Sequence, residues 1–212
     1  ALGMAVHESQ SLIIEMQACR SRSFAHYLSS LLAEQFGKQP GFEPNNLYRL
    51  LIQVGPSLIR VHADELTYPL HIIVRYEIEQ ALLNGEITVD DLPALWDTLM
   101  QRYLGLSTQG NDADGVMQDV HWAAGLFGYF PSYTVGSLLA AQLYATISQK
   151  QPELSEMLAT GNFSTLGRWL KDHIHQRASS VSFDCLVEEA TGQRLDATNF
   201  LNHIKRRYLE FT

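Results

Sequence analysis

Residues 115–136 gather the side chains of this sequence that are best suited to chemistry. His121 and Tyr133 stand there among glycines, aromatic residues and Pro131. A glycine costs about 1 kcal/mol in a helix interior, and proline lacks an N–H and disfavours helical geometry in the preceding residue. We therefore expect a turn that presents His121 and Tyr133 from two adjoining elements, where they can donate hydrogen bonds to a developing negative charge. The alternative is a buried helix–turn–helix whose polar side chains are simply satisfied.

A second cluster packs four ionisable groups into six residues: Arg60, His62, Asp64 and Glu65. Arg60 and Asp64 are four residues apart and could pair on one helix face. The planar fork of a guanidinium also binds a carboxylate through two hydrogen bonds. The cluster is thus either a solvated charged face or an arginine held for an anionic group.

A third candidate is Glu8, which follows His7 near the start of the sequence. Glu8, Leu12 and Met16 are spaced by four, so they share one face of the expected helix. A carboxylate on a buried face needs a cation, hydrogen-bond donors or a metal, whereas in a first turn it would only favour the helix dipole. The pair begins like the HExxH of zinc proteases, but Ser11 stands where the second histidine is needed.

Composition limits the class of protein. The chain has 212 residues, 46% of them hydrophobic and 18% charged, with a formal net charge of −8. The negative charge argues against nucleic acid as a partner, because phosphate binding needs a basic surface. No segment approaches the roughly 18 apolar residues of a membrane span. Cys19 and Cys185 are too few for a disulfide framework, which favours the cytoplasm.

Hydrophobic periodicity predicts an all-α chain that forms a single unit. Asp90-Asp91 and Pro93 are typical of a helix start, residues 105–114 are expected to form a polar loop, and Asp196 is expected to cap the last helix. The expected helices cover residues 7–36, 46–54, 57–84, 93–104 and 131–149, with shorter ones over 152–212 broken at Gly161-Asn162, Ala178-Ser180 and Thr191-Gly192.

Four motifs in register give the chain a family resemblance. They are His7-Glu8-Ser9-Gln10-Ser11, Ile59-Arg60 with Ala63-Asp64-Glu65-Leu66-Thr67-Tyr68, Gly115-x-x-Gln118-Asp119-x-His121-Trp122, and Phe130-Pro131-x-Tyr133-x-x-Gly136. In order and separation they resemble the carboxypeptidase Taq family, over essentially all of residues 1–212. The resemblance implies the multi-helix C-terminal part of a gluzincin-type zinc metallocarboxypeptidase, usually a homodimer, that hydrolyses C-terminal amino acids from peptides.

The resemblance also implies roles for single residues. Glu8 would be the third metal ligand, for zinc or another divalent metal such as cobalt. Arg60 would grip the carboxylate of the peptide C-terminus. His121 and Tyr133 would line the catalytic site and steady the tetrahedral oxyanion or the substrate terminus.

One departure from the family pattern affects the expected activity. The family's HExxH lies N-terminal to the His-Glu-Ser-Gln motif, and this sequence has only six residues before that motif. A catalytic zinc usually has three protein ligands, and Glu8 alone remains. We therefore expect the parent protein to be a carboxypeptidase and the 212-residue chain alone to be inactive, with weak zinc binding or none. The alternative is a non-catalytic helical module for interaction or dimerisation.

Overall fold

The computed structural model describes residues 3–210 and divides into two compact units. The first unit consists of Ala1–Gln53 with Val135–Thr212, and the second of Val54–Thr134. No β-strand occurs between residues 3 and 210, which confirms the all-α prediction. Within the same range, no helix has the length and apolar character needed to cross a bilayer.

The first unit begins with an interrupted helix rather than the single helix predicted over residues 7–36. Helix α1 (Met4–Leu12) continues as a π-helical turn over Ile13–Ala18, and α2 (Arg22–Phe36) starts after a break. The break lies at Ser21, whose backbone is extended and whose side chain accepts a hydrogen bond from the Phe24 N–H. Ser21 is therefore an N-cap, and the prediction was wrong because no glycine or proline marks this position.

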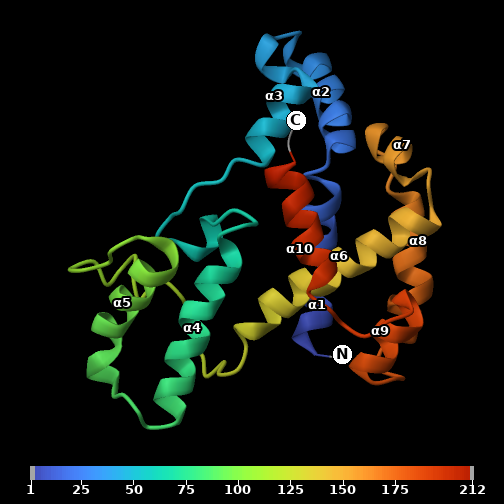
Figure 1. Ribbon diagram of the computed structural model, residues 1–212. Helices are drawn as coiled ribbons and strands as arrows, with labels where there is room; N and C mark the ends of the chain where they lie inside the picture. Colours follow the sequence, from blue (N-terminus) through green and yellow to red (C-terminus); the bar gives the residue numbers. More distant parts are fainter. Residues whose placement is uncertain (1–2, 211–212) are drawn as a thin grey trace. The chain divides into compact units, whose positions relative to one another are not determined.

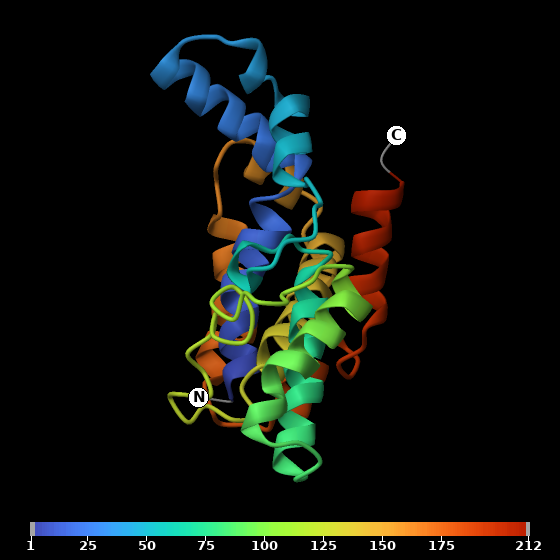
Figure 2. The same cartoon turned by 90° about the vertical axis from the view of Figure 1, so that its left-hand side faces the viewer.

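Helix α3 (Pro44–Leu51) packs on α2, as Figures 1 and 2 show. A short 3₁₀ turn over Pro40–Phe42 connects them. Helix α3 starts and ends earlier than the predicted range of 46–54, with Pro44 in its first turn. The Asn46 amide donates to the carbonyl of Pro40 at 2.8 Å.

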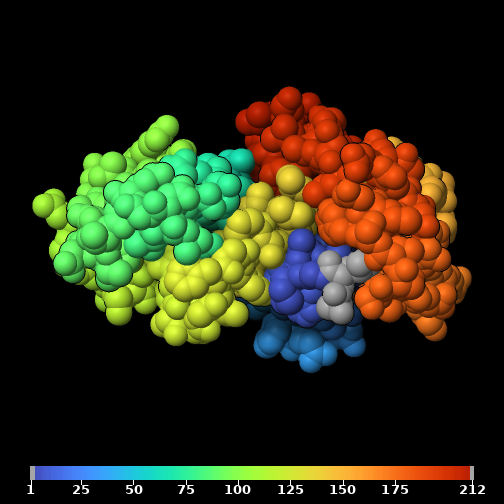
Figure 3. All heavy atoms as spheres, turned by 90° about the horizontal axis from the view of Figure 1, so that it is seen from below, coloured from blue at the N-terminus to red at the C-terminus, as the bar shows by residue number. Residues whose placement is uncertain are grey.

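The rest of the first unit surrounds α6 (Pro131–Lys150), whose first residues belong to the second unit. Leu12 and Ile13 share a buried core with Leu139 and Leu143 of α6 and with apolar residues of α8 and α9. Figure 3 shows the atoms of α1 in blue against the orange α8–α9 segment. The predicted breaks are confirmed by the helix bounds, which are α7 Leu154–Ala159, α8 Ser164–His173, α9 Phe183–Thr191 and α10 Thr198–Ile204.

The predicted Asp196 cap of the last helix is wrong. Helix α10 has Ala197 as its N-cap without a side-chain cap hydrogen bond, and the Asp196 carboxylate, one residue earlier, accepts from the Thr198 N–H at 2.6 Å. Beyond α10 the chain makes a π-helical turn over Lys205–Leu209. There Arg207 is buried and donates to the carbonyls of Met16 and Gln17.

The second unit is a pair of helices followed by a segment of turns. Helices α4 (Tyr68–Leu83) and α5 (Leu92–Leu104) lie side by side in Figures 1 and 2. Their core contains Val74, Ile78, Trp96, Leu99, Met100 and Leu104. Helix α5 is preceded by a 3₁₀ turn (Val89–Asp91) that starts with a capping box of Thr88 and Asp91.

Helix α4 is shorter than the predicted range of 57–84, and its buried face is partly polar. Residues 57–67 precede it and contain only a 3₁₀ turn, Arg60–His62. Tyr76 is 47% exposed, and Leu70, Ile73 and Ala81 are only partly buried. Polar side chains occupy much of the buried face.

Candidate functional site

The side chain of Arg60 is a buried cation of the second unit with several hydrogen-bond partners. Its Nε and Nη2 both donate to Asp119 Oδ1, at 3.0 and 2.8 Å, and its Nη1 donates to the Tyr68 hydroxyl at 3.0 Å. The guanidinium lies 4.9 Å from the ring centroid of Tyr133. Burial lowers the pKa of Arg60, but the hydrogen bonds and charge of Asp119 outweigh it and leave the pKa above its ordinary value. Arg60 is thus a permanently charged group in a fixed orientation.

Gln118 joins the loop before α6 to the segment that carries Arg60. Its side-chain oxygen accepts from the Arg60 backbone N–H at 2.8 Å. Its amide nitrogen donates to the carbonyls of Leu58 and Asp114, at 3.0 and 2.7 Å. A single amide side chain therefore fixes residues 58–60 against residues 114–118, which places Asp119 opposite Arg60.

A second arginine shares the carboxylate of Asp119. Arg75 on α4 has no solvent exposure, and its Nε donates to Asp119 Oδ2 at 2.6 Å. Asp119 therefore accepts from Arg60 on one oxygen and from Arg75 on the other. Burial raises the pKa of Asp119, but the hydrogen bond from Arg60 and the charges of both arginines outweigh it, so the net shift is downward.

Glu79 anchors the aromatic turn to α4. This buried carboxylate accepts from Trp122 Nε1 at 2.9 Å and from the backbone N–H of Gly128. Gly125 and Gly128 adopt φ angles of 73° and 74°, which glycine takes readily and other residues rarely do. Residues 121–130 are consequently held as a compact turn.

The turn brings His121 and Tyr133 together, as the sequence predicted. His121 Nε2 lies 3.0 Å from the Tyr133 hydroxyl, and the His121 ring packs on buried Phe130 with centroids 4.3 Å apart. His121 Nδ1 is buried without a hydrogen-bond partner among the described residues, 3.8 Å from Asp119 Oδ1. Burial lowers the pKa of His121 despite the charge of Asp119, so the imidazole is neutral at pH 7.

The predicted pair of Arg60 and Asp64 is wrong, and so is the solvated charged face. Asp64 is buried, and its oxygens accept from the backbone N–H groups of Gly55, Leu66 and Thr67 and from the Thr67 hydroxyl. This carboxylate fixes the local turn before α4. Of the four ionisable groups in the cluster, only His62 is exposed.

Glu8 lies in the first unit, on the second turn of α1. The helix starts at Met4 and has no acidic residue in its first turn, so the helix-dipole alternative is not supported. Glu8 is half-buried, on the same face as buried Leu12. Its Cβ lies where α1 and α6 approach closely, since a Cβ built on Gly136 would stand 2.8 Å from it. The glycine leaves room for α1 and so determines where Glu8 sits.

The sequence reading missed Arg75 and Glu79. Together with His71 they are spaced by four on α4, and all three are buried. Residues four apart share one helix face, so this ionisable stripe in a mostly apolar helix was the available signal. This signal is weak, because the neighbouring apolar residues fit a helical period as well.

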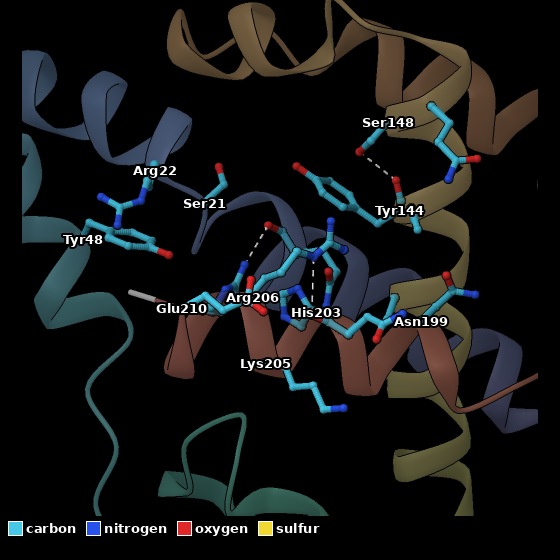
Figure 4. Close-up of a pocket in the computed structure, with 16 residues that line it drawn as sticks. Ser21, Arg22, Tyr48, Tyr144, Ser148, Asn199, His203, Lys205, Arg206 and Glu210 are labelled. Atoms are coloured by element: carbon cyan, nitrogen blue, oxygen red, sulfur yellow. Dashed lines mark hydrogen bonds between the residues drawn. The ribbon is translucent and has the colours of Figure 1, made fainter. Parts of the chain in front are cut away.

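A hollow in the first unit contains none of the predicted site residues. Its volume is about 790 Å³, and its side chains come from α2, α3, α6, α10 and the turn after α10. Figure 4 shows its basic residues Arg22, His203, Lys205 and Arg206 together with Glu210. The backbone carbonyl of Asn202 accepts from Arg206 Nε there. This hollow is chemically distinct from the arginine–histidine cluster of the second unit.

The sequence of this chain matches a known protein family and several curated relatives. The family model for carboxypeptidase Taq (M32) metallopeptidases matches residues 1–208. The chain belongs to this family. It is 40% identical over 208 residues to thermostable carboxypeptidase 1 of Thermus thermophilus and 39% identical over 206 residues to carboxypeptidase 1 of Bacillus subtilis. These alignments cover 98% and 97% of the chain.

Solved structures agree with the sequence relatives. The structure of Trypanosoma cruzi metallocarboxypeptidase 1 superposes with a TM-score of 0.95 at 42% identity, over 99% of this chain and 44% of that one. A Pyrococcus furiosus carboxypeptidase structure gives 0.92 at 35% identity, over 98% of this chain and 42% of that one. These matches confirm the helical fold and show that the chain corresponds to the C-terminal part of the family's fold.

The chain spans only about 41% of the length of the curated relatives it matches. The family implies a divalent metal, so the donor set of the chain can be tested against it. Within residues 3–210 no three or more His, Cys, Asp or Glu side chains are grouped to hold a metal ion. The described residues alone therefore do not fit a complete metal centre.

Proposed function

We propose that the complete protein containing this chain is a metallocarboxypeptidase that removes amino acids from peptide C-termini. The observation that best supports this proposal is the hydrogen bonding of the Arg60 guanidinium. Three of its five N–H groups are bonded to Asp119 and Tyr68, which fixes the plane of the guanidinium. The two remaining N–H groups, one on each Nη atom, are suited to the free carboxylate of a peptide, since guanidinium–carboxylate pairs are strong and geometrically specific.

His121 and Tyr133 are proposed to line the same site and steady the tetrahedral oxyanion or the substrate terminus. The two side chains are in hydrogen-bond contact at 3.0 Å, and the lowered pKa of His121 keeps its imidazole neutral. A neutral imidazole and a phenol can donate to a developing oxyanion without adding a charge that competes with Arg60 for the peptide carboxylate.

Glu8 is proposed as the third protein ligand of a zinc ion, with cobalt as a second candidate. A bound metal of this kind polarises the scissile carbonyl and lowers the pKa of a water molecule. We infer that the two other ligands and the general base come from the part of the family's polypeptide that this chain does not match. The 212-residue chain alone is then inactive and holds zinc weakly or not at all. We further propose a cytoplasmic homodimer.

Hydrolysis of matched peptides tests the proposed function. The complete protein is expected to release the last residue of an N-acylated dipeptide with a free carboxylate and to leave its C-terminal amide intact. Arg60→Met should raise KM for the free acid by about tenfold or more, since one charge-assisted contact is worth about 1.5–3 kcal/mol. Arg102→Met, on the exposed surface of α5, is the matched control.

Two results would overturn the proposal. If the complete protein cleaves neither substrate with zinc or cobalt present, the alternative of a non-catalytic helical module takes its place. If Arg60→Met cleaves the free acid as well as the unmodified protein does, Arg60 does not hold the substrate carboxylate.

A further inference from the structure

We propose that Arg75 is a positioning residue that supplies the charge Arg60 needs to hold a carboxylate. This inference rests on the proposed function and assigns a role to a residue outside the four motifs. Arg75 does not line the proposed peptide site. It acts through Asp119, which is paired with Arg75 through Oδ2 and with Arg60 through Oδ1.

The argument starts from the charge of the contact cluster. Arg60 and Asp119 alone form a neutral pair, and a neutral pair attracts an incoming carboxylate weakly. Arg75 binds the second oxygen of Asp119 at 2.6 Å, which brings the three-residue cluster to a net charge of +1. In a buried setting one unit of charge strongly changes the interaction with a nearby anion, because there is little solvent to screen it. Arg60 can therefore be held in place by the Asp119 carboxylate while the cluster keeps enough positive charge to bind the carboxylate of a substrate.

Two other buried carboxylates near the cluster, Asp64 and Glu79, have hydrogen-bond partners of their own. Asp64 is satisfied by the N–H groups of its own turn, and Glu79 by Trp122 and Gly128. Neither is within ion-pair distance of Arg60 or Arg75. His121 and His71 both have lowered pKa values and add no positive charge at pH 7.

Arg75 is itself held rigidly, as a positioning group must be. Its Nη1 donates to the backbone carbonyl of His71 at 2.8 Å, and its guanidinium lies 4.6 Å from the ring centroid of Trp96 and 5.6 Å from that of Phe130. Burial lowers its pKa to about 10, against the opposing charge of Asp119, so it remains protonated at pH 7. Its Nη2 is buried without a hydrogen-bond partner among the described residues. Burying a charged guanidinium is energetically costly, and here one of its nitrogens has no hydrogen-bond partner among the described residues. Packing alone does not explain an arginine at this position.

The test compares two variants of the complete protein. Arg75→Met keeps an apolar stem between Trp96 and Phe130 and removes the charge. In the double variant Arg75→Met/Asp119→Asn, the asparagine oxygen can still accept from Arg60, and the cluster returns to a net charge of +1. Arg102→Met controls for removal of an exposed arginine on the same unit.

The readout is the preference for a free-acid peptide over its C-terminal amide, measured both as kcat/KM and as competitive displacement of a fluorescent peptide. Arg75→Met is expected to reduce the preference by about tenfold or more, mainly through KM, and the double variant to recover much of it. A role in packing alone predicts that the double variant is no better than Arg75→Met.

Each outcome decides between the proposals. If the unmodified protein is active and the preference survives in Arg75→Met, or if the double variant recovers nothing, the inference is overturned and the proposed function stands. If the unmodified protein binds the acid over the amide without cleaving it, and Arg75→Met loses that preference, the charge role stands and the proposed function fails. Absence of both binding and cleavage in the unmodified protein overturns both.

Discussion

Asp119 receives donors from residues 44 and 59 positions away in the chain. Such long-range pairs explain why the sequence could predict which single residues suit catalysis but not which residues they contact. Arg60 and His121 could be selected because their residue types suit catalysis. The partner assigned to Arg60 was wrong, because Asp64, at helical spacing, is used by its own turn. The proposed role of Arg75 depends on its contact with Asp119, 44 residues away in the chain. The only local sequence signal is the spacing by four of ionisable residues on α4.

Glu79→Gln tests the anchoring of the aromatic turn. The carboxylate accepts from two N–H groups, and the glutamine amide can accept from only one of them and turns a donor toward the other. Leaving a buried donor unsatisfied costs about 1–3 kcal/mol. The free energy of unfolding from urea titration should fall by this amount. Glu86→Gln, at an exposed position of the same unit, should change it by less than about 0.5 kcal/mol. Equal stability of both variants would contradict the anchoring role.

His71 predicts a pH dependence of stability. Its side chain is fully buried, and desolvation together with the charges of Arg75 and Arg60 lowers its pKa from 6.5 to about 4. Between these values the unfolded chain binds more protons than the folded one, so the free energy of unfolding falls as the pH decreases from 6.5 to 4. The contribution of this one group is on the order of 3 kcal/mol.

Thermal unfolding at a series of pH values measures this effect. In His71→Leu the loss of stability between pH 6.5 and pH 4 should be smaller than in the unmodified protein, whatever the variant's stability at pH 7. His62→Leu, which replaces an exposed histidine of the same unit, is the control. An unchanged slope in His71→Leu would show that His71 is not the group that titrates.

Secondary-structure elements were more predictable from the sequence than side-chain contacts were. Pro131, Gly161 and Gly192 mark true helix boundaries, since proline and glycine change the allowed backbone directly. The π-helical turn at Ile13–Ala18 and the Ser21 cap were not predicted. Serine is compatible with a helix interior as well as with a cap, so its sequence signal is weak. The polar side chains on the buried face of α4 were also missed, because their burial depends on partners in the loop before α6.

Gly136→Ala tests how closely α1 and α6 approach each other. The new Cβ would stand 2.8 Å from Glu8 Cβ and 3.2 Å from the carbonyl oxygen of Ala5. Alanine favours a helix over glycine by about 1 kcal/mol, but overpacking of this kind costs about 1–3 kcal/mol. We expect a net loss of stability, measured by urea unfolding. We also expect weaker metal binding by the complete protein, because α1 and Glu8 must shift.

Gly167 provides the matched control for this substitution. It is an exposed glycine of α8 with no atom within 4 Å of a built Cβ. Gly167→Ala should therefore stabilise the protein by up to about 1 kcal/mol. If both substitutions stabilise equally, the approach of the two helices at Gly136 is looser than the structure indicates.

At the scale of the whole molecule, the division into two units separates the proposed roles. Arg60, His121 and Tyr133 belong to the second unit, and Glu8 to the first. The chain also covers only about 41% of the length of its curated relatives. Four motifs in register were enough to predict the family, which the family model confirms, whereas the substrate-binding groups stay a prediction. Within residues 3–210 no three or more His, Cys, Asp or Glu side chains are grouped to hold a metal ion, so these residues do not define a complete metal centre.

This division leads to a prediction about metal content. The 212-residue chain, purified without chelator, should carry far less than one zinc per chain. A catalytic zinc takes about three protein ligands, and Glu8 is the single ligand that we assign within residues 3–210. Elemental analysis after gel filtration measures the ratio. The complete protein should carry about one metal ion, and Glu8→Gln in it should lower metal affinity, since an amide replaces an anionic ligand. One firmly bound zinc on the chain alone, retained in Glu8→Gln, would show that other side chains complete a site in this half and that Glu8 is not a ligand.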